Sequence, residues 1–112
     1  MTISDIWKEI EKRANDHPEY VEDINATYTV KLSGEEKNTY SLIFKKEGTT
    51  VIKEELDDAD CVLSMNTKSF KKLLQGNLNT TAAFMSGKLK VKGNIGLALK
   101  LEEALKKFQF GS

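Results

Sequence analysis

The last quarter of the chain holds its clearest pattern, a short alternating segment followed by a long apolar one. In the alternating segment Leu89 and Val91 are separated by lysines, and this period of two predicts a half-buried strand at the edge of a sheet. Gly93 breaks that strand, and Asn94 is placed to cap a helix that begins at Ile95. We therefore expect a short helix, a tight turn, a strand, a second turn and a long helix in succession.

The long C-terminal helix is apolar on two sides. At about 100° per residue, Ile95 and Leu99 lie almost opposite the main apolar arc. A helix that covers a sheet needs one apolar stripe, so the second side must face another element or a molecule that is not protein, such as a lipid. Periodicity alone leaves open a simpler interpretation, in which this side meets neighbouring helices. The main arc consists of Leu97, Ala98, Leu101, Ala104, Leu105 and Phe108.

The first part of the chain predicts one amphipathic helix and one hairpin. Apolar side chains recur at helical spacing over residues 3–14, behind a capping box that starts at Thr2. Residues 25–32 and 39–45 mostly alternate between apolar and polar side chains. They predict two antiparallel strands joined across residues 33–36.

The middle of the chain predicts two more strands and two short helices. Gly48 starts a turn before a strand at residues 50–54, and apolar side chains alternate again over residues 61–65. Thr67 is expected to cap a helix, and a second short helix begins at about Asn79. Together these elements predict an α+β fold, with a five-stranded, mostly antiparallel sheet that helices cover on one face.

Length and composition fit one soluble globular domain spanning residues 1–112. Hydrophobic residues make up 39% and charged residues 30% of the chain, and no apolar stretch approaches the length of a membrane span. The polar N-terminal segment does not resemble a signal peptide, and the lone Cys61 fits a reducing compartment. The ending Phe110-Gly111-Ser112 differs from peroxisomal signals of the Ser-Lys-Leu type. We therefore expect a cytoplasmic protein, in a cytosol of the prokaryotic type.

Charge is zero overall but uneven along the chain. Residues 1–65 hold 8 Lys or Arg against 15 Asp or Glu, whereas residues 66–112 hold 9 against 2. This asymmetry fits either a transient contact with an anionic membrane surface or mutual neutralisation of the two halves in the fold. No nucleic acid partner is expected, because the domain is neutral and its lysine-rich strand has no interleaved aromatic residues.

The sequence contains no catalytic or metal-binding constellation. His17 and Cys61 are the single histidine and cysteine, which excludes paired-histidine and CxxC sites. A nucleophilic pair of these two residues is disfavoured because the cysteine lies inside an apolar strand. Asp57, Asp58 and Asp60 lack the glycine and glutamate spacing of a calcium-binding loop, so we expect solvated carboxylates. We expect no enzyme activity and no cofactor.

Three motifs closely resemble the signature of the sterol carrier protein 2 family. They are GNLN at residues 76–79, AFMSGKLKVKGN at residues 83–94 and LALKL at residues 97–101. Asn94 stands where the family often has Asp, and Thr80 where it often has Pro; both are exchanges between residues that cap or start helices.

This resemblance implies a non-catalytic carrier that holds a fatty acid, a fatty acyl-CoA or a sterol-like molecule in an apolar tunnel, as a monomer or homodimer. The alternative is an interaction or dimerisation module that assists a lipid-metabolising enzyme. The side chains expected to line the tunnel are Phe84, Met85, Leu97, Leu101, Leu105 and Phe108, with Trp7, Ile10, Phe70 and Leu74 as the opposite wall.

Overall fold

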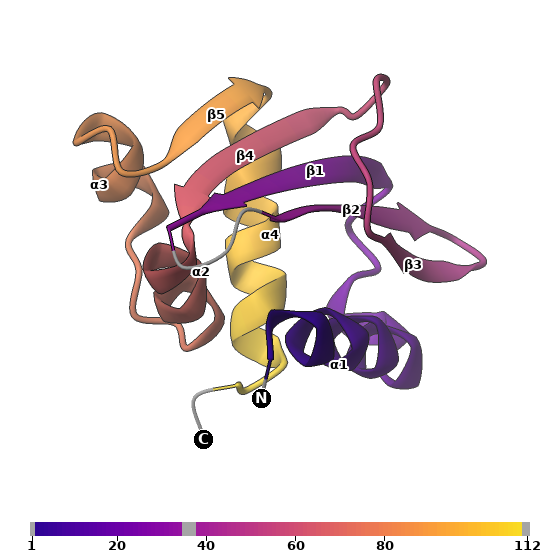
Figure 1. Cartoon of the computed structure of the whole chain (residues 1–112). Helices are drawn as coiled ribbons and strands as arrows, with labels where there is room; N and C mark the ends of the chain where they lie inside the picture. The colour runs from indigo at the N-terminus through magenta and orange to yellow at the C-terminus, as the bar shows by residue number, and fades with distance from the viewer. Residues whose placement is uncertain (1, 35–37, 111–112) are drawn as a thin grey trace.

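The computed structural model describes residues 2–34 and 38–110 of the chain (Figure 1). In order, its elements are α1 (Ile3–Asp16), the 3-10 turn η1 (Pro18–Tyr20), β1 (Ala26–Ser33), β2 (Asn38–Lys45), β3 (Gly48–Ile52), β4 (Cys61–Asn66), α2 (Thr67–Leu74), α3 (Thr80–Met85), β5 (Lys90–Gly93) and α4 (Ile95–Lys107).

Within these residues the strands form one five-stranded sheet in the order β3-β2-β1-β4-β5. The central β1 and β4 run parallel, with Tyr28 opposite Cys61, and the other neighbours pair antiparallel. The α+β class and the mostly antiparallel sheet are therefore confirmed. The predicted lysine-rich strand, β5, lies at the edge, with Lys90 and Lys92 exposed.

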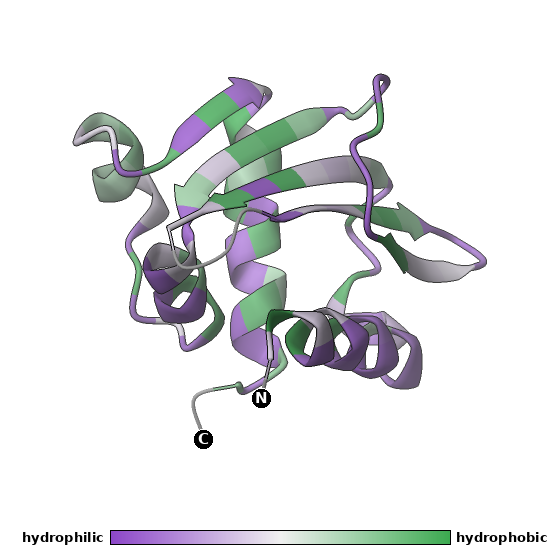
Figure 2. Cartoon of the chain, in the orientation of Figure 1, coloured by the Kyte–Doolittle hydropathy of each residue, from purple (hydrophilic) through white to green (hydrophobic). Residues whose placement is uncertain are grey.

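The helices lie on one face of the sheet. α4 crosses β4 and β5, α2 packs on β4 and β1, and α1 lies against β3 near the other edge (Figure 1). Apolar and polar residues alternate along the strands, and α1 turns its hydrophilic side outward (Figure 2). In β1, for example, Tyr28 and Val30 are buried toward the helices. The apolar core is the layer between the sheet and these helices.

The opposite face of the sheet is tied together by polar contacts. Thr29 and Ser41 lie side by side on β1 and β2, with 2.9 Å between their hydroxyl oxygens. The Ser41 hydroxyl also donates to the carbonyl of Glu54, at 2.7 Å. The connection between β3 and β4 thus packs on this outer face, where Lys31 also pairs with Glu55 at 3.1 Å.

Two predicted helix starts are confirmed. The Thr2 hydroxyl accepts a hydrogen bond from the Asp5 amide at 3.1 Å and the Asp5 carboxylate accepts one from the Thr2 amide, which completes the capping box. At the start of α4 the Asn94 side chain accepts from the Gly96 amide at 2.7 Å. These bonds satisfy backbone donors that have no partner inside the helix.

Two predicted boundaries were wrong. Asn66, not Thr67, caps α2, since its side chain accepts from the Ser69 amide at 2.7 Å while Thr67 is the first helical residue. The third strand spans Gly48–Ile52 rather than residues 50–54, because Gly48 already pairs with Lys45 across a two-residue turn. The predicted 33–36 turn falls partly at residues 35 and 36, which lie outside the described residues.

Gly93 closes the turn between β5 and α4 at a position that no other residue fits. Its φ of 103° lies in the left-handed region, and a Cβ there would lie 2.5 Å from the Asp60 carbonyl oxygen. The close approach of the backbone at the start of β4 therefore requires glycine, and this fixes where α4 begins over the sheet.

Candidate functional site

The main apolar arc of α4 faces the sheet. Leu101, Leu105 and Phe108 are each no more than 3% exposed, and Leu97 is partly buried against the same core. The Tyr28 hydroxyl on β1 donates a 2.7 Å hydrogen bond to the Leu97 carbonyl. Because Leu97 lies in the first turn of α4, this bond anchors that end of the helix over the sheet.

The predicted opposite wall lies in the same apolar layer. Trp7 and Ile10 on α1, and Phe70 and Leu74 on α2, are all at most 4% exposed. The Trp7 ring stacks between Phe70, at 5.0 Å between ring centroids, and Tyr40 of β2, at 4.8 Å. α1, α2 and the sheet therefore meet at one stack of three aromatic rings.

Phe84 and Met85 lie apart from this interior group. They end the short helix α3 at the edge of the domain, where Phe84 is 41% and Met85 79% exposed. Their neighbour Ala83 is buried instead. The structure thus brings eight of the ten predicted residues into the layer between sheet and helices and leaves these two at the surface.

The second apolar side of α4 reaches the surface. Leu99 is 38% exposed and lines a groove of about 260 Å³ together with Tyr20, Ile24 and Ala104. The simpler interpretation, in which neighbouring helices cover this side, is therefore wrong for Leu99. The groove is bounded by Ile24 and Ala104, which belong to the buried core, so it leads from the surface toward the interior.

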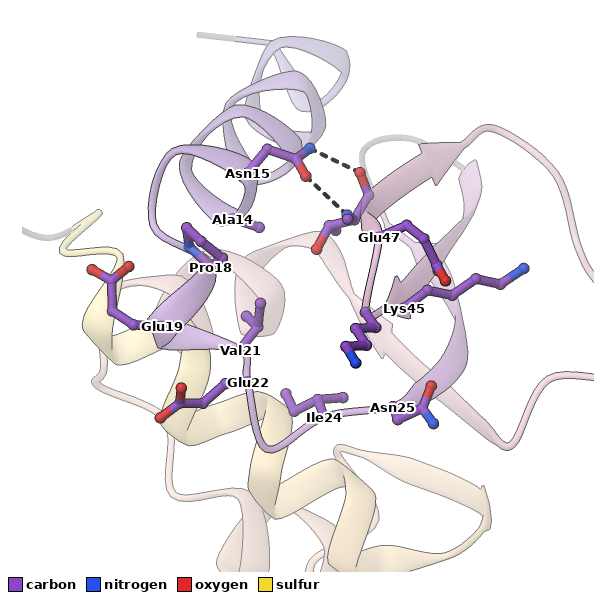
Figure 3. A pocket seen from close by; sticks show the side chains of 13 residues that line it. Ala14, Asn15, Pro18, Glu19, Val21, Glu22, Ile24, Asn25, Lys45 and Glu47 are labelled. Carbon is purple, nitrogen blue, oxygen red and sulfur yellow. Dashed lines mark hydrogen bonds between the residues drawn. The ribbon is translucent and has the colours of Figure 1, made fainter.

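A larger hollow of about 800 Å³ lies on the other side of the segment that follows α1 (Figure 3). Ala14, Val21 and Ile24 supply its apolar lining, and Ile24 also lines the groove beside α4. Asn15 closes one side by bonding the backbone of Thr49 twice, at 2.9 Å each. The remaining lining is charged or polar and comes from the η1 region and the β2–β3 turn, including Glu19, Glu22, Asn25, Lys45, Lys46 and Glu47.

Sequence reasoning missed the residues that the segment after α1 contributes to the two hollows. Tyr20, Val21 and Ile24 belong to no periodic segment, and η1 was not predicted. Three large apolar residues between two predicted elements were the available signal, because an exposed connection rarely carries so many.

The charge asymmetry along the sequence becomes an asymmetry in space. Residues 61–101 contain seven lysines and no acidic residue, and they form β4, α2, α3, β5 and the start of α4. Apart from the central β4, these elements lie on the left and at the back in Figure 1, with α1 and β3 on the right. Within the described residues each ion pair joins two residues of the same sequence half, so direct pairing does not neutralise the halves.

The groups considered for catalysis are not arranged for it. Cys61 is fully buried in β4, and burial, together with the charge of Asp60, raises the pKa of its thiol to about 11. The thiol is therefore protonated near neutral pH and is not a nucleophile. His17 is exposed at the end of α1, where its ring stacks on Tyr20 at 4.7 Å and contacts Glu19.

Neither a metal cluster nor a membrane-spanning helix is found in the described part of the chain. No three potential acidic, histidine or cysteine ligands gather around one point there. The Asp60 carboxylate is instead occupied by the Thr27 amide, which donates to it at 2.8 Å. Each described helix is too short or too polar to cross a bilayer.

One buried carboxylate joins α3 to α4. Glu102 is 9% exposed and accepts two hydrogen bonds from Thr80, from its amide at 3.0 Å and from its hydroxyl at 2.8 Å. A proline at position 80 could supply neither donor. Thr80, which stands where the family often has Pro, is therefore coupled to the buried Glu102.

Comparison with known proteins gives consistent matches. A sequence model described as the SCP-2 sterol transfer family matches residues 7–106. Hydroxysteroid dehydrogenase-like protein 2 of Rattus norvegicus is 49% identical over 88 residues, 78% of this chain and 17% of that protein. The protein of the same name in Xenopus laevis is 42% identical over 92% of this chain and 24% of its own length. The chain thus spans about a fifth of these relatives.

A solved structure shares the fold over nearly the whole chain. Sterol carrier protein 2 from Yarrowia lipolytica, in its apo form, superposes with a TM-score of 0.79 and 31% sequence identity. The superposition covers 94% of this chain and 90% of that one.

Proposed function

The chain belongs to the SCP-2 sterol transfer family, and on that premise we propose that it binds a lipid between its sheet and helices and transfers it between membranes. One observation carries the proposal. The groove lined by Leu99, Tyr20, Ile24 and Ala104 leads from the surface to the buried layer. An apolar molecule that enters along α4 therefore meets these apolar side chains at a mouth that Asp23, Lys100, Glu103 and Lys107 also line.

The lipid must enlarge the interior as it enters. A groove of about 260 Å³ lies below the range of about 300–1,000 Å³ that small-molecule sites usually span. We assign the lining of the enlarged site to the eight buried or partly buried residues of the predicted set. A slight separation of α4 from α1 would let an acyl chain take the place of contacts between these side chains.

Apolar contact alone supplies enough binding energy. Each buried methylene contributes about 0.8 kcal/mol, so a chain of about sixteen carbons gains roughly 12 kcal/mol before the loss of ligand freedom is subtracted. Micromolar or tighter binding then requires no charged partner in the protein. Fatty acids, fatty acyl-CoA and sterol-like molecules fit this requirement, and no catalytic step is part of the proposal.

Delivery to a membrane would use the basic side of the domain. Each lysine near an anionic bilayer contributes about 1 kcal/mol of attraction, which fades within a Debye length. The exposed Phe84 and Met85 lie on α3 beside this lysine-rich edge. We therefore expect acyl transfer to anionic vesicles to exceed transfer to neutral ones, and the difference to shrink as salt rises from about 0.05 to 0.5 M.

A pair of matched variants tests this delivery step. Changing the three lysines of this lysine-rich edge to Gln should reduce the excess of acyl transfer to anionic over neutral vesicles without changing equilibrium lipid affinity. An equal change of charge on the opposite side of the domain should leave the difference between the two vesicle types nearly unchanged. The edge set is Lys88, Lys90 and Lys92, and the control set is Lys45, Lys46 and Lys53. One transfer rate for both vesicle types, independent of salt and vesicle concentration, would mean that lipid leaves through water.

The binding step is tested by mass spectrometry of organic extracts from the purified protein. We expect one acyl or sterol-like molecule per chain, and rebinding of that molecule after its removal. Extracts that are repeatedly empty would contradict the lipid carrier.

A second candidate is an interaction or dimerisation module. It is favoured by one observation: in the relatives, the matching region is about a fifth of a longer protein whose name is that of a dehydrogenase-like protein. Empty extracts together with a stable dimer in solution would support this function over lipid transport.

A further inference from the structure

Trp7 carries a buried hydrogen-bond donor for which the described part of the chain supplies no acceptor. The side chain is 2% exposed, and its Nε1 has no partner among the described residues. No other buried side-chain nitrogen or oxygen of the described residues lacks a partner; the Tyr28 hydroxyl, for example, donates to the Leu97 carbonyl at 2.7 Å. Buried donors without partners are rare in folded proteins and destabilise them.

The contacts of the indole ring do not account for the N–H group. The ring lies nearly parallel to Tyr40 and Phe70, with interplanar angles of 17° and 15°. A phenyl ring at position 7 could stack in the same place without bringing an unsatisfied donor into the core. The N–H group becomes useful only if an acceptor enters this layer.

We propose that the Trp7 N–H group is the polar anchor of the lipid site and donates a hydrogen bond to an oxygen of the bound lipid. The inference rests on the proposed function, because it places the ligand in the layer that α1, α2 and the sheet enclose. Trp7 would set the orientation of a ligand that otherwise makes only apolar contacts.

The surroundings of Trp7 favour an uncharged oxygen. Its close neighbours Tyr40 and Phe70 are buried rings, and Ile10 on the same helix is fully buried. Near the stack, Lys53 is an exposed side chain whose Nζ lies 6.0 Å from the centre of the Tyr40 ring. A single N–H donor does not offset the desolvation of a carboxylate. The group that Trp7 binds is therefore the uncharged alcohol, ketone or ester oxygen of a lipid.

The test compares 1-hexadecanol with hexadecane, which differ by one oxygen, on the delipidated full chain. Replacing the Trp7 indole by benzothiophene, which keeps the bicyclic shape and lacks the N–H group, should weaken hexadecanol binding by about five- to tenfold. Hexadecane binding should stay the same. Trp7→Phe should likewise weaken hexadecanol binding more than hexadecane binding. Phe70→Leu, which trims the stack but keeps the indole, should change both affinities by one common factor.

The single tryptophan gives a spectroscopic readout of the same bond. Its indole N–H proton resonance should move downfield on binding hexadecanol and hardly move on binding hexadecane. Equal loss of both affinities, or no downfield shift, would overturn the anchor while leaving lipid binding intact. If palmitate binds more tightly than hexadecanol and its affinity falls further when benzothiophene replaces the indole, the group that Trp7 binds is not an uncharged oxygen. A wild-type chain that binds none of the three would overturn the proposed function itself and the anchor with it.

Discussion

Arg13 joins the end of α1 to the end of α4, where the proposed lipid layer opens. Its Nη1 donates to the carbonyl oxygen of Phe108 at 2.5 Å, and its guanidinium lies 4.3 Å from the centre of the Phe110 ring. Its Nε also donates to Glu9 at 2.8 Å, but that contact stays within α1. Replacing Arg13 by Met keeps an unbranched apolar stem and removes the contacts between the two helices.

The contacts between the helices set the size of the effect. A hydrogen bond to a charged group contributes about 1.5–3 kcal/mol, and we take the low end because the Arg13 side chain is 32% exposed. A cation–π contact at such a site adds about 0.5–1 kcal/mol. Together they give about 2 kcal/mol, which corresponds to about 30-fold in the equilibrium for separating the helix ends.

Stopped-flow release of a fluorescent fatty acid measures this opening. Arg13→Met should speed release by up to about 30-fold, and Arg13→Lys should lie between it and the wild type because lysine lacks the planar fork. Lys12→Met is the matched control, since Lys12 is exposed and its ion pair with Asp16 stays within α1. Unchanged release in Arg13→Met, together with faster hydrogen exchange at the end of α4, would show that lipid enters elsewhere.

Three further substitutions probe the interior. Thr80→Pro should lower the free energy of unfolding in urea by about 2–3 kcal/mol, because Glu102 stays buried without its two donors. The same substitution should cost much less stability in a chain that already carries Glu102→Leu. An equal loss of stability in the two backgrounds would refute the coupling of Thr80 to Glu102. Leu101→Trp should weaken fatty acid binding at least tenfold, or roughly 1.4 kcal/mol, because the larger ring takes up ligand volume. Ile43→Trp, on the outer face of the sheet, should leave fatty acid binding unchanged. Unchanged fatty acid affinity in Leu101→Trp would remove Leu101 from the site. Because burial raises the pKa of Cys61 from 9.0 to about 11, the unfolded chain loses this proton first as pH rises, so stability should fall between those values. Cys61→Ala should remove that part of the decline, and identical pH profiles would contradict it.

Local patterns in the sequence were sufficient for the elements whose ends are fixed by adjacent residues. The lysine alternation of β5 and the Asn94 cap of α4 are examples, since both depend on contacts within a few positions. The boundary at α2 was wrong by one residue because Asn66 and Thr67 are both capping types. Tertiary contact decides between them, as the Thr67 hydroxyl donates to the distant Ser33 carbonyl at 3.0 Å.

The site could be predicted only in its interior part. Helical periodicity places the buried arc of α4 correctly, because that face packs on the sheet along its whole length. It does not separate buried from exposed side chains in α3, whose six residues are too few to define a stripe. The wall of the groove opposite α4 was missed, because tertiary folding rather than sequence proximity brings Ile24 to that helix.

The position of a bound acyl chain tests most directly whether lipid lies between the sheet and the helices. Uniformly ¹³C-labelled palmitate bound to delipidated, unlabelled protein should give isotope-filtered nuclear Overhauser contacts to the methyl groups of Leu101, Leu105 and Ile10, all buried in that layer. Contacts confined to Ala14 and Val21 in the mixed-charge hollow, or no contacts at all, would contradict an interior lipid site.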